Sequence, residues 1–143
     1  RYLFPDPATG GAAKRLFLYL RWMVRAPDGL DLGTWRALEP RVHPRGLVVP
    51  LDTHMSRIAR YLGFTRRKTD DLRAAREITR RFAELDPEDP VRFDMALCHL
   101  GITGRCPRQL DLAKCASCPI GSVCRVTAKR VRRPRASAGA VRR

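Results

Sequence analysis

Acidic side chains are scarce in this sequence of 143 residues, with 14 Asp and Glu against 29 Lys and Arg and a net charge of +15. From Arg125 to the end of the chain there is no acidic residue, but there are eight basic ones. So large an excess of one charge favours a polyanion as the partner. A membrane surface is the weaker candidate, because no basic amphipathic helix with a lipid-facing aromatic side is evident.

Long apolar runs are also missing, since none reaches the roughly 18 residues of a membrane-spanning helix and no segment has the form of a signal peptide. Cysteine is sparse as well, with five in the chain, and four of them lie within the 19 positions from Cys106 to Cys124. A secreted disulfide-rich domain would spread its cysteines along the chain. The clustering favours a metal site in a reducing compartment.

Helical spacing of apolar residues dominates the rest of the chain, and neither an internal repeat nor a convincing sheet is present. Residues 11–25 predict a buried helix, because apolar side chains occur on most of its sides. Three amphipathic helices are predicted at about 53–62, 70–85 and 89–100, the last with Asp89 as N-cap and Pro90 at its first position. Residues 26–51 predict a loop with one helical turn near Trp35 and a short strand-like segment at 47–49. The fold class is therefore all-α.

Four of the cysteines, Cys106, Cys115, Cys118 and Cys124, follow the spacing C-x8-C-x2-C-x5-C. Four thiolates in one short loop can bind either a [4Fe–4S] cluster or a single Zn²⁺ ion. Structural zinc sites usually show two CxxC pairs, whereas this loop has one, so the spacing favours the iron–sulfur cluster. Cys98 lies outside this pattern, and we interpret it as a small buried apolar residue.

A more specific pattern occurs at 43–62, where a Gly- and Pro-rich loop leads into the run PLDTHMSRIARYLGF and then into amphipathic helices. Together with the cysteine loop, this run resembles the helix–hairpin–helix Gly/Pro/Asp (HhH-GPD) superfamily of base-excision DNA glycosylases, which includes endonuclease III and the adenine DNA glycosylases. The segments Lys14–Arg25 and Asp86–Asp94 resemble an uncharacterised bacterial branch. One departure is the first cysteine gap, which is x8 here and x6 in the family.

The resemblance implies an all-α HhH-GPD domain over 1–101, expected to be the C-terminal part of such a domain. An iron–sulfur loop over 102–124 and a disordered basic tail over 125–143 would follow it. It also implies a monomer that acts on double-stranded DNA in the bacterial cytoplasm, at the nucleoid, without a protein partner.

Asp52 takes the position of the family's catalytic carboxylate, which would stabilise positive charge at the sugar C1′ as the glycosidic bond breaks. The competing interpretation is that Asp52 is only the N-cap of the helix that follows. Lys14 takes the position of the lysine that forms a Schiff base in family members with AP-lyase activity. The family's Gly-Val-Gly hairpin is absent, and residues 26–45 resemble an insertion, so a phosphate contact or a surface position remains open for Lys14.

Phosphate contacts would come from the residues around the hairpin and from the basic segment after the second helix. We expect them to be Gly10, Gly11, Arg15, Arg66, Arg67 and Lys68. The predicted function is thus a DNA N-glycosylase that acts on a flipped base, with AP-lyase activity as an open addition. The alternative is a non-catalytic nucleic-acid-binding module with a structural zinc or iron–sulfur site. A nuclease is disfavoured, because no carboxylate cluster for Mg²⁺ is evident.

Overall fold

Short helices make up the regular secondary structure of residues 4–131, the part of the chain that the computed structural model describes. Backbone pairing of the β type occurs there only as one isolated bridge between Gly11 and Asp71. The predicted all-α class is therefore confirmed. In chain order the elements are η1 (Pro7–Thr9), α1 (Lys14–Val24), η2 (Arg36–Leu38), η3 (Pro44–Gly46), α2 (Thr53–Leu62), α3 (Leu72–Ala83), η4 (Pro90–Phe93), α4 (Asp94–Ile102), α5 (Leu112–Ala116) and α6 (Arg125–Val131).

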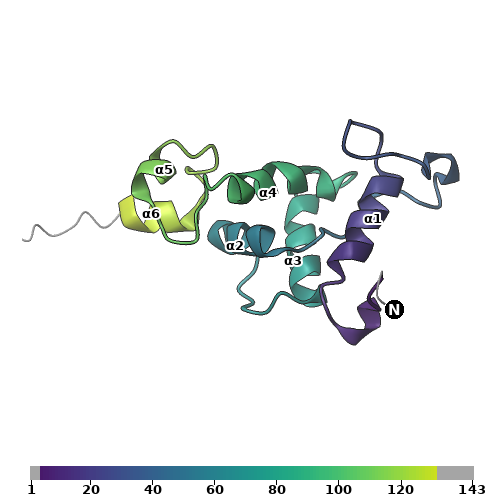
Figure 1. The fold of residues 1–143 in the computed structure, drawn as a ribbon, viewed down its shortest axis with the longest axis horizontal. Helices are drawn as coiled ribbons and strands as arrows, with labels where there is room; N and C mark the ends of the chain where they lie inside the picture. The colour runs from purple at the N-terminus through teal and green to yellow at the C-terminus, as the bar shows by residue number, and fades with distance from the viewer. Residues whose placement is uncertain (1–3, 132–143) are drawn as a thin grey trace, which may run out of the picture.

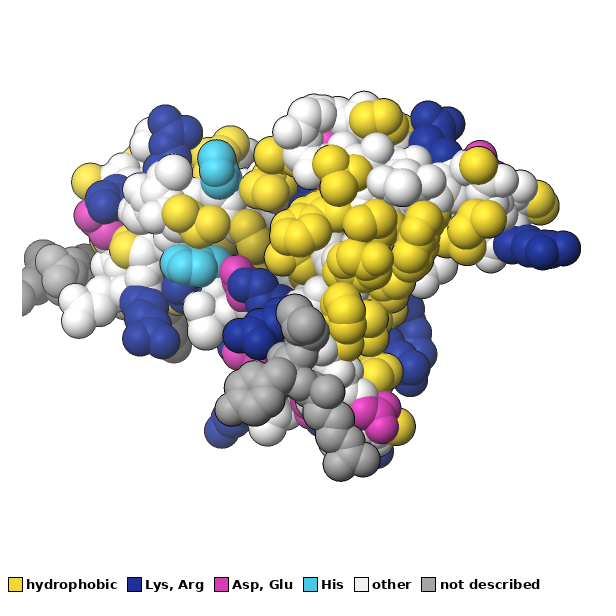
Figure 2. All heavy atoms as spheres, turned by 45° about the vertical axis from the view of Figure 1, so that its right-hand side comes forward, with side chains coloured by type: hydrophobic (Ala, Val, Ile, Leu, Met, Phe, Trp, Pro, Cys, Tyr) yellow, Lys and Arg dark blue, Asp and Glu magenta, His cyan; other side chains and the backbone are white. Residues whose placement is uncertain are grey.

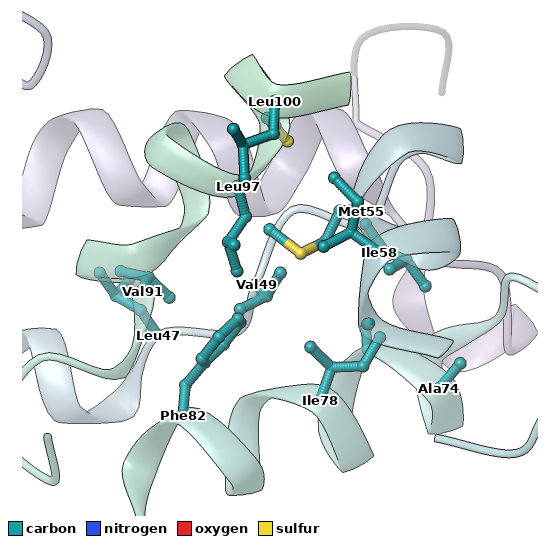
Figure 3. Close-up of a cluster of buried hydrophobic side chains, with 14 of the residues drawn as sticks. Leu47, Val49, Met55, Ile58, Ala74, Ile78, Phe82, Val91, Leu97 and Leu100 are labelled. Atoms are coloured by element: carbon teal, nitrogen blue, oxygen red, sulfur yellow. The ribbon is translucent and has the colours of Figure 1, made fainter. Parts of the chain in front are cut away.

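Helices α2, α3 and α4 form the centre of the molecule, with α1 on one side and α5 and α6 on the other (Figure 1). Their apolar faces meet in one core, which accounts for the helical spacing seen in the sequence (Figure 3). Its most deeply buried side chains include Val49, Met55, Ile58, Ala75, Ile78, Phe82 and Val91.

The segment 47–51 enters this core as an extended chain, and the short strand predicted at 47–49 does not form. Val49 is fully buried, and its N–H donates to the hydroxyl of Thr79 at 3.0 Å. Because a side chain on α3 satisfies this amide, the segment needs no neighbouring strand. It therefore leads directly to Asp52 at the start of α2.

The helix boundaries agree with the sequence for α2, which spans 53–62 and ends at Gly63 in the left-handed conformation (φ 77°). The third predicted helix starts differently. A 3₁₀ turn precedes α4, and Asp89 makes no side-chain capping bond. Its carboxylate instead accepts from Arg25 Nε at 2.9 Å. Asp89 is thus at the predicted N-cap position, but its carboxylate binds the guanidinium of Arg25, the residue after α1, and caps no helix amide.

Only one face of α1 is buried, and it carries Phe17, Arg21 and Val24. The prediction of a helix buried on most sides is therefore wrong. Trp22 on the outer face is 38% exposed, and apolar side chains gather in a broad patch on the side of the molecule that carries α1 (Figure 2). Patches of this kind often mark contact sites, and the expected monomer without a protein partner does not account for it.

A helix also replaces part of the expected disordered tail, since α6 begins at Arg125, directly after Cys124. Ala128 N donates to Cys124 O at 3.0 Å, so the helix grows out of the cysteine loop. The prediction of disorder from residue 125 is wrong up to residue 131, and residues 132–143 lie outside the described part. Across residues 4–131, no helix has both the length and the apolar character needed to cross a membrane.

Gly101 of α4 packs against His54 of α2, where an added Cβ would lie 2.5 Å from His54 Nδ1 and 2.7 Å from His54 Cβ. We expect Gly101→Ala to lower the free energy of unfolding by about 1–3 kcal/mol, because the backbones must separate. Urea unfolding followed by circular dichroism measures this change. Gly46→Ala is the matched control, since its Cβ would meet no atom within 4 Å. Equal stability of the two variants would contradict this packing.

Candidate functional site

Lys14 and Asp52 lie next to each other in the structure, although 38 positions separate them in the sequence. Lys14 Nζ is 3.4 Å from Asp52 Oδ2, and the two side chains are 48% and 17% exposed. A pair this open to water adds little stability. The structure therefore brings together the two residues that the sequence proposed for chemistry, at a place that a substrate can reach.

Asp52 is also the N-cap of α2, because its Oδ1 accepts from Met55 N at 2.7 Å. The capping interpretation and the proximity to Lys14 are thus both correct for the same carboxylate. One oxygen is bound to the helix, and the other is turned toward the amine. Since capping leaves only a few side-chain orientations, it fixes the direction of Oδ2.

Lys14 is the first residue of α1, and the residue before it has an unusual backbone. Ala13 lies in the left-handed region (φ 44°, ψ 36°), 6% exposed, and provides no side-chain cap. A non-glycine residue in this region carries strain of about 1 kcal/mol or more. The side chain before α1 therefore does not cap the start of this helix, a position that generally favours anions.

The predicted phosphate contacts fall into two groups that meet at the start of α3. Gly10 O accepts from Leu72 N at 3.0 Å, and Gly11 forms the bridge with Asp71. Arg67 binds the Asp71 carboxylate at 2.6 Å. The glycine turn and the basic segment 66–68 therefore lie on the same side of the protein. Arg15 is exposed in the first turn of α1.

Arg66 and Arg67 line a basic groove of about 760 Å³ at the C-terminal ends of α2 and α3. We call it the arginine groove. Lys68 is not part of its lining; its carbonyl accepts from Arg60 at 3.1 Å. The groove also includes Arg125 of α6, which is distant in the sequence. Its lining is Gly63, Phe64, Thr65, Arg66, Arg67, Glu77, Arg80, Arg81, Glu84 and Arg125.

Two residues that the sequence did not assign to the site lie behind Asp52. Cys98 is buried as predicted, at 9% exposure, but its thiol lies 3.8 Å from Asp52 Oδ1 and 3.6 Å from Asp94 Oδ1. Asp94 is itself 4% exposed. A sequence signal was present, because Asp94 and Cys98 are one helical turn apart within an otherwise apolar helix.

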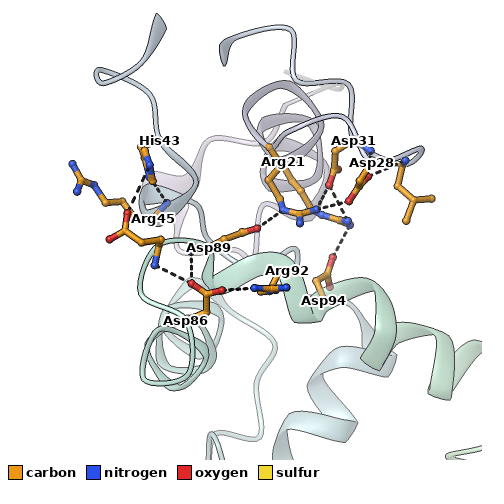
Figure 4. Close-up of polar contacts among 12 residues, drawn as sticks. Arg21, Asp28, Asp31, His43, Arg45, Asp86, Asp89, Arg92 and Asp94 are labelled. Carbon is orange, nitrogen blue, oxygen red and sulfur yellow. Dashed lines mark hydrogen bonds and ion pairs between the residues drawn. The ribbon is translucent and has the colours of Figure 1, made fainter. Parts of the chain in front are cut away.

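Asp94 is held by a buried guanidinium. Arg21 donates to Asp94 Oδ2 and to Asp31 Oδ2, both at 3.1 Å, and it is 1% exposed (Figure 4). Arg25, the C-cap residue that follows α1, adds contacts to Asp28, Asp31 and Asp89. The loop after α1 and the start of α4 are therefore tied to α1 by charge, although the sequence indicated only an apolar helix.

Burial changes the acid–base properties of this inner group. Loss of hydration raises the pKa of Asp94 to about 6, against the opposing effect of Arg21. Burial, and then the neighbouring carboxylates of Asp94 and Asp52, raise the pKa of the Cys98 thiol far above its usual value. The Cys98 sulfur therefore keeps its proton and acts as a hydrogen-bond donor, not as a nucleophile.

The four loop cysteines, Cys106, Cys115, Cys118 and Cys124, line one small cavity of about 20 Å³ against Ile58 and Tyr61 of α2. Burial raises the pKa of the Cys106 thiol, while the Arg57 guanidinium favours its thiolate. Arg57 also donates to the Cys106 carbonyl at 2.7 Å, which holds the loop on α2. The four cysteines that the sequence spacing linked thus line one common cavity.

Each of the two groups that the spacing suggested takes four thiolates, and the loop contains four cysteines. Among residues 4–131, no three His, Cys, Asp or Glu side chains are arranged closely enough to hold one ion. A [4Fe–4S] cluster binds each thiolate to a different iron, so its sulfurs stand farther apart than those around one zinc ion. The cavity has room for about one water molecule, and a cluster requires the loop to widen.

These features define a helical protein with an exposed Lys–Asp pair, a buried carboxylate behind it and a four-cysteine loop. Residues 1–103 match a family of proteins of unknown function, DUF2400, and the chain belongs to that family. The match includes Lys14, Asp52 and Asp94 but ends before Cys106. Neither the curated proteins nor the solved structures contain a match to the chain.

We expect anaerobically purified protein to contain about four iron and four sulfide per chain, with broad brown absorbance. Cys115→Ser should lose most of this metal, because it removes one ligand. Cys98→Ser is the matched control and should retain it, since Cys98 lies beside Asp52. About one zinc per chain would instead identify the alternative occupant. Metal-free protein, or equal loss from both variants, would contradict the site.

Proposed function

We propose that this chain is part of a base-excision DNA glycosylase of the HhH-GPD type, with Asp52 as its catalytic carboxylate. The observation that carries the proposal is the 3.4 Å approach of Lys14 Nζ to Asp52 Oδ2. The resemblance pairs a lysine and an aspartate in one site, and two distant segments of this chain meet in that way. The partially exposed position of the pair suits a nucleotide flipped out of a duplex.

Asp52 would act on the sugar of the flipped nucleotide. As the bond between C1′ and the base breaks, the base leaves with the bonding electrons, and positive charge develops at the sugar. A carboxylate fixed beside C1′ stabilises that charge better than mobile water does. The N-cap bond to Met55 supplies this fixation before the substrate arrives.

Lys14 would determine whether the strand is also cut. Its amine, once deprotonated, can form a bond to C1′ and give a Schiff base after the sugar ring opens, and strand cleavage by elimination follows. Asp52 lies close enough to exchange a proton with this amine. If a water molecule attacks C1′ instead, the enzyme is a glycosylase without lyase activity, and Lys14 serves as a phosphate contact.

Duplex binding would use the exposed Lys14 at the start of α1 and the arginine groove. The groove is lined by five arginines and two glutamates, so its field attracts phosphates. The cysteine loop, with its iron–sulfur cluster or zinc ion, would brace this side of the protein through Arg57 and α6. Within the bacterial cytoplasm the partner would be nucleoid DNA.

A non-catalytic nucleic-acid-binding module is the second candidate, and one observation favours it. Asp52 has a structural role as an N-cap that needs no catalysis. In that case the same basic surfaces bind DNA, and Lys14 pairs with the cap without chemical consequence. Base release distinguishes the two candidates.

We expect Asp52→Asn to reduce base release by about 10²–10³-fold with little change in duplex affinity. Asn is as good an N-cap as Asp, so the variant keeps its helix while losing its charge. The assay uses duplexes that each contain one damaged or mispaired base. Borohydride trapping of a covalent adduct, lost in Lys14→Met, tests the lyase step. Base release by Asp52→Asn at the wild-type rate would refute the catalytic role.

We expect the double variant Arg66→Gln/Arg80→Gln to reduce the slope of log Kobs against log[salt] by about 2. Each phosphate contact releases counterions equivalent to about 0.9 of slope, and both residues line the arginine groove. Fluorescence anisotropy of a labelled duplex measures the slope. Arg36→Gln, with its charge on η2 outside the groove, is the control. An unchanged slope in the double variant would show that DNA does not occupy the groove.

A further inference from the structure

A chain of polar contacts runs inward from the Lys14–Asp52 pair. Asp52 Oδ1 lies 3.8 Å from the Cys98 sulfur, which lies 3.6 Å from Asp94 Oδ1. Asp94 Oδ2 then accepts from Arg21 Nη1 at 3.1 Å. Side-chain exposure falls along this chain from 17% at Asp52 to 6% at Asp94 and 1% at Arg21. The proposed catalytic carboxylate therefore rests against the Cys98 thiol, behind which Asp94 and Arg21 form a buried ion pair.

Within this series of polar contacts, Cys98 lies between the carboxylates of Asp52 and Asp94. Without a donor between them, Asp52 and Asp94 would repel each other through a poorly hydrated space. Both acceptors lie within reach of the single thiol proton, and burial keeps that proton on the sulfur. Asp94 cannot move away, since Arg21 anchors it from the other side.

We propose that Cys98 is a positioning residue for Asp52, held in place by Asp94 and Arg21. Its S–H keeps Asp52 Oδ1 at the start of α2, where this oxygen also accepts from Met55 N at 2.7 Å. The second oxygen, Oδ2, then faces Lys14 and the solvent side. Loss of the donor would let Asp94 push Asp52 outward, away from its cap position.

The test compares Cys98→Ala, which removes the donor, with Cys98→Ser, which keeps a donor of similar size. Both variants leave Asp94, Arg21 and the arginine groove in place. This inference rests in part on the proposed function, so two readouts are needed. One is base release, and the other follows Asp52 without any activity.

In the kinetic readout, Cys98→Ala should lower kcat by about tenfold with KM unchanged, because the carboxylate is displaced while DNA contacts remain. Cys98→Ser should stay within about threefold of wild type, since its hydroxyl replaces the thiol as donor. A purely structural role would not produce this rescue in kcat. Full kcat in Cys98→Ala would overturn the proposal.

In the second readout, hydrogen exchange of the Met55 amide follows its bond to Asp52 Oδ1. Cys98→Ala should accelerate this exchange by about tenfold, as expected when one hydrogen bond is lost. The Ser56 amide is the internal control, because it donates to the backbone oxygen of Asp52 at 2.8 Å and should not change. Unchanged Met55 exchange would overturn the positioning role, even in a protein that releases no base. If Met55 exchange is faster in Cys98→Ala but the wild-type protein releases no base, the positioning role is supported and only the glycosylase proposal is refuted.

Discussion

The geometry of the candidate site depends on one buried guanidinium. Arg21 lies two helical turns after Lys14 on the same face of α1, and it binds Asp31 and Asp94 in the interior. Charges removed from water are costly to leave unpaired, so a shift of α1 away from α4 is strongly opposed. Because α4 packs on α2, this ion group also sets the distance between the start of α1 and the start of α2. Lys14 and Asp52 stand at those two starts.

Asp52 shows how a structural role and a chemical role can coincide in one side chain. An N-cap carboxylate has few allowed orientations, and it remains charged next to the free amides of the helix. Those are the properties that a group stabilising a developing positive charge requires. Capping therefore does not argue against catalysis at this position. The capping bond keeps the Asp52 carboxylate in a fixed orientation before a substrate binds.

The four-cysteine loop is a separate addition to this framework. The family match ends at residue 103, whereas the loop begins at Cys106 and packs on the opposite end of α2 from Asp52. Arg57 holds the loop through the Cys106 carbonyl, and Arg125, the first residue of α6, lies against Gly63 at the C-terminus of α2. Metal binding in the loop would thus stabilise the arginine groove more directly than it would stabilise the Lys14–Asp52 pair.

Local sequence determined much of this protein. The spacing of apolar residues was enough to predict α2 to within its boundaries, because helix periodicity and a terminal glycine act over a few positions. The spacing of the cysteines likewise indicated that they lie together, and all four line one cavity. The run around Asp52 was enough to identify its capping position, whereas the choice of Lys14 came from the family resemblance.

Only the tertiary structure decided the rest, because it depends on contacts between distant segments. Arg21 in an apolar helix anchors Asp94, and the carboxylate of Asp89 binds Arg25 in place of a helix amide. Cys98, interpreted as a small apolar residue, became a donor between two carboxylates. Arg80, Arg81 and Arg125 joined Arg66 in one groove. Charge pairing and hydrogen bonding act at about 3–4 Å through space, and no sequence period records which distant segments will come that close.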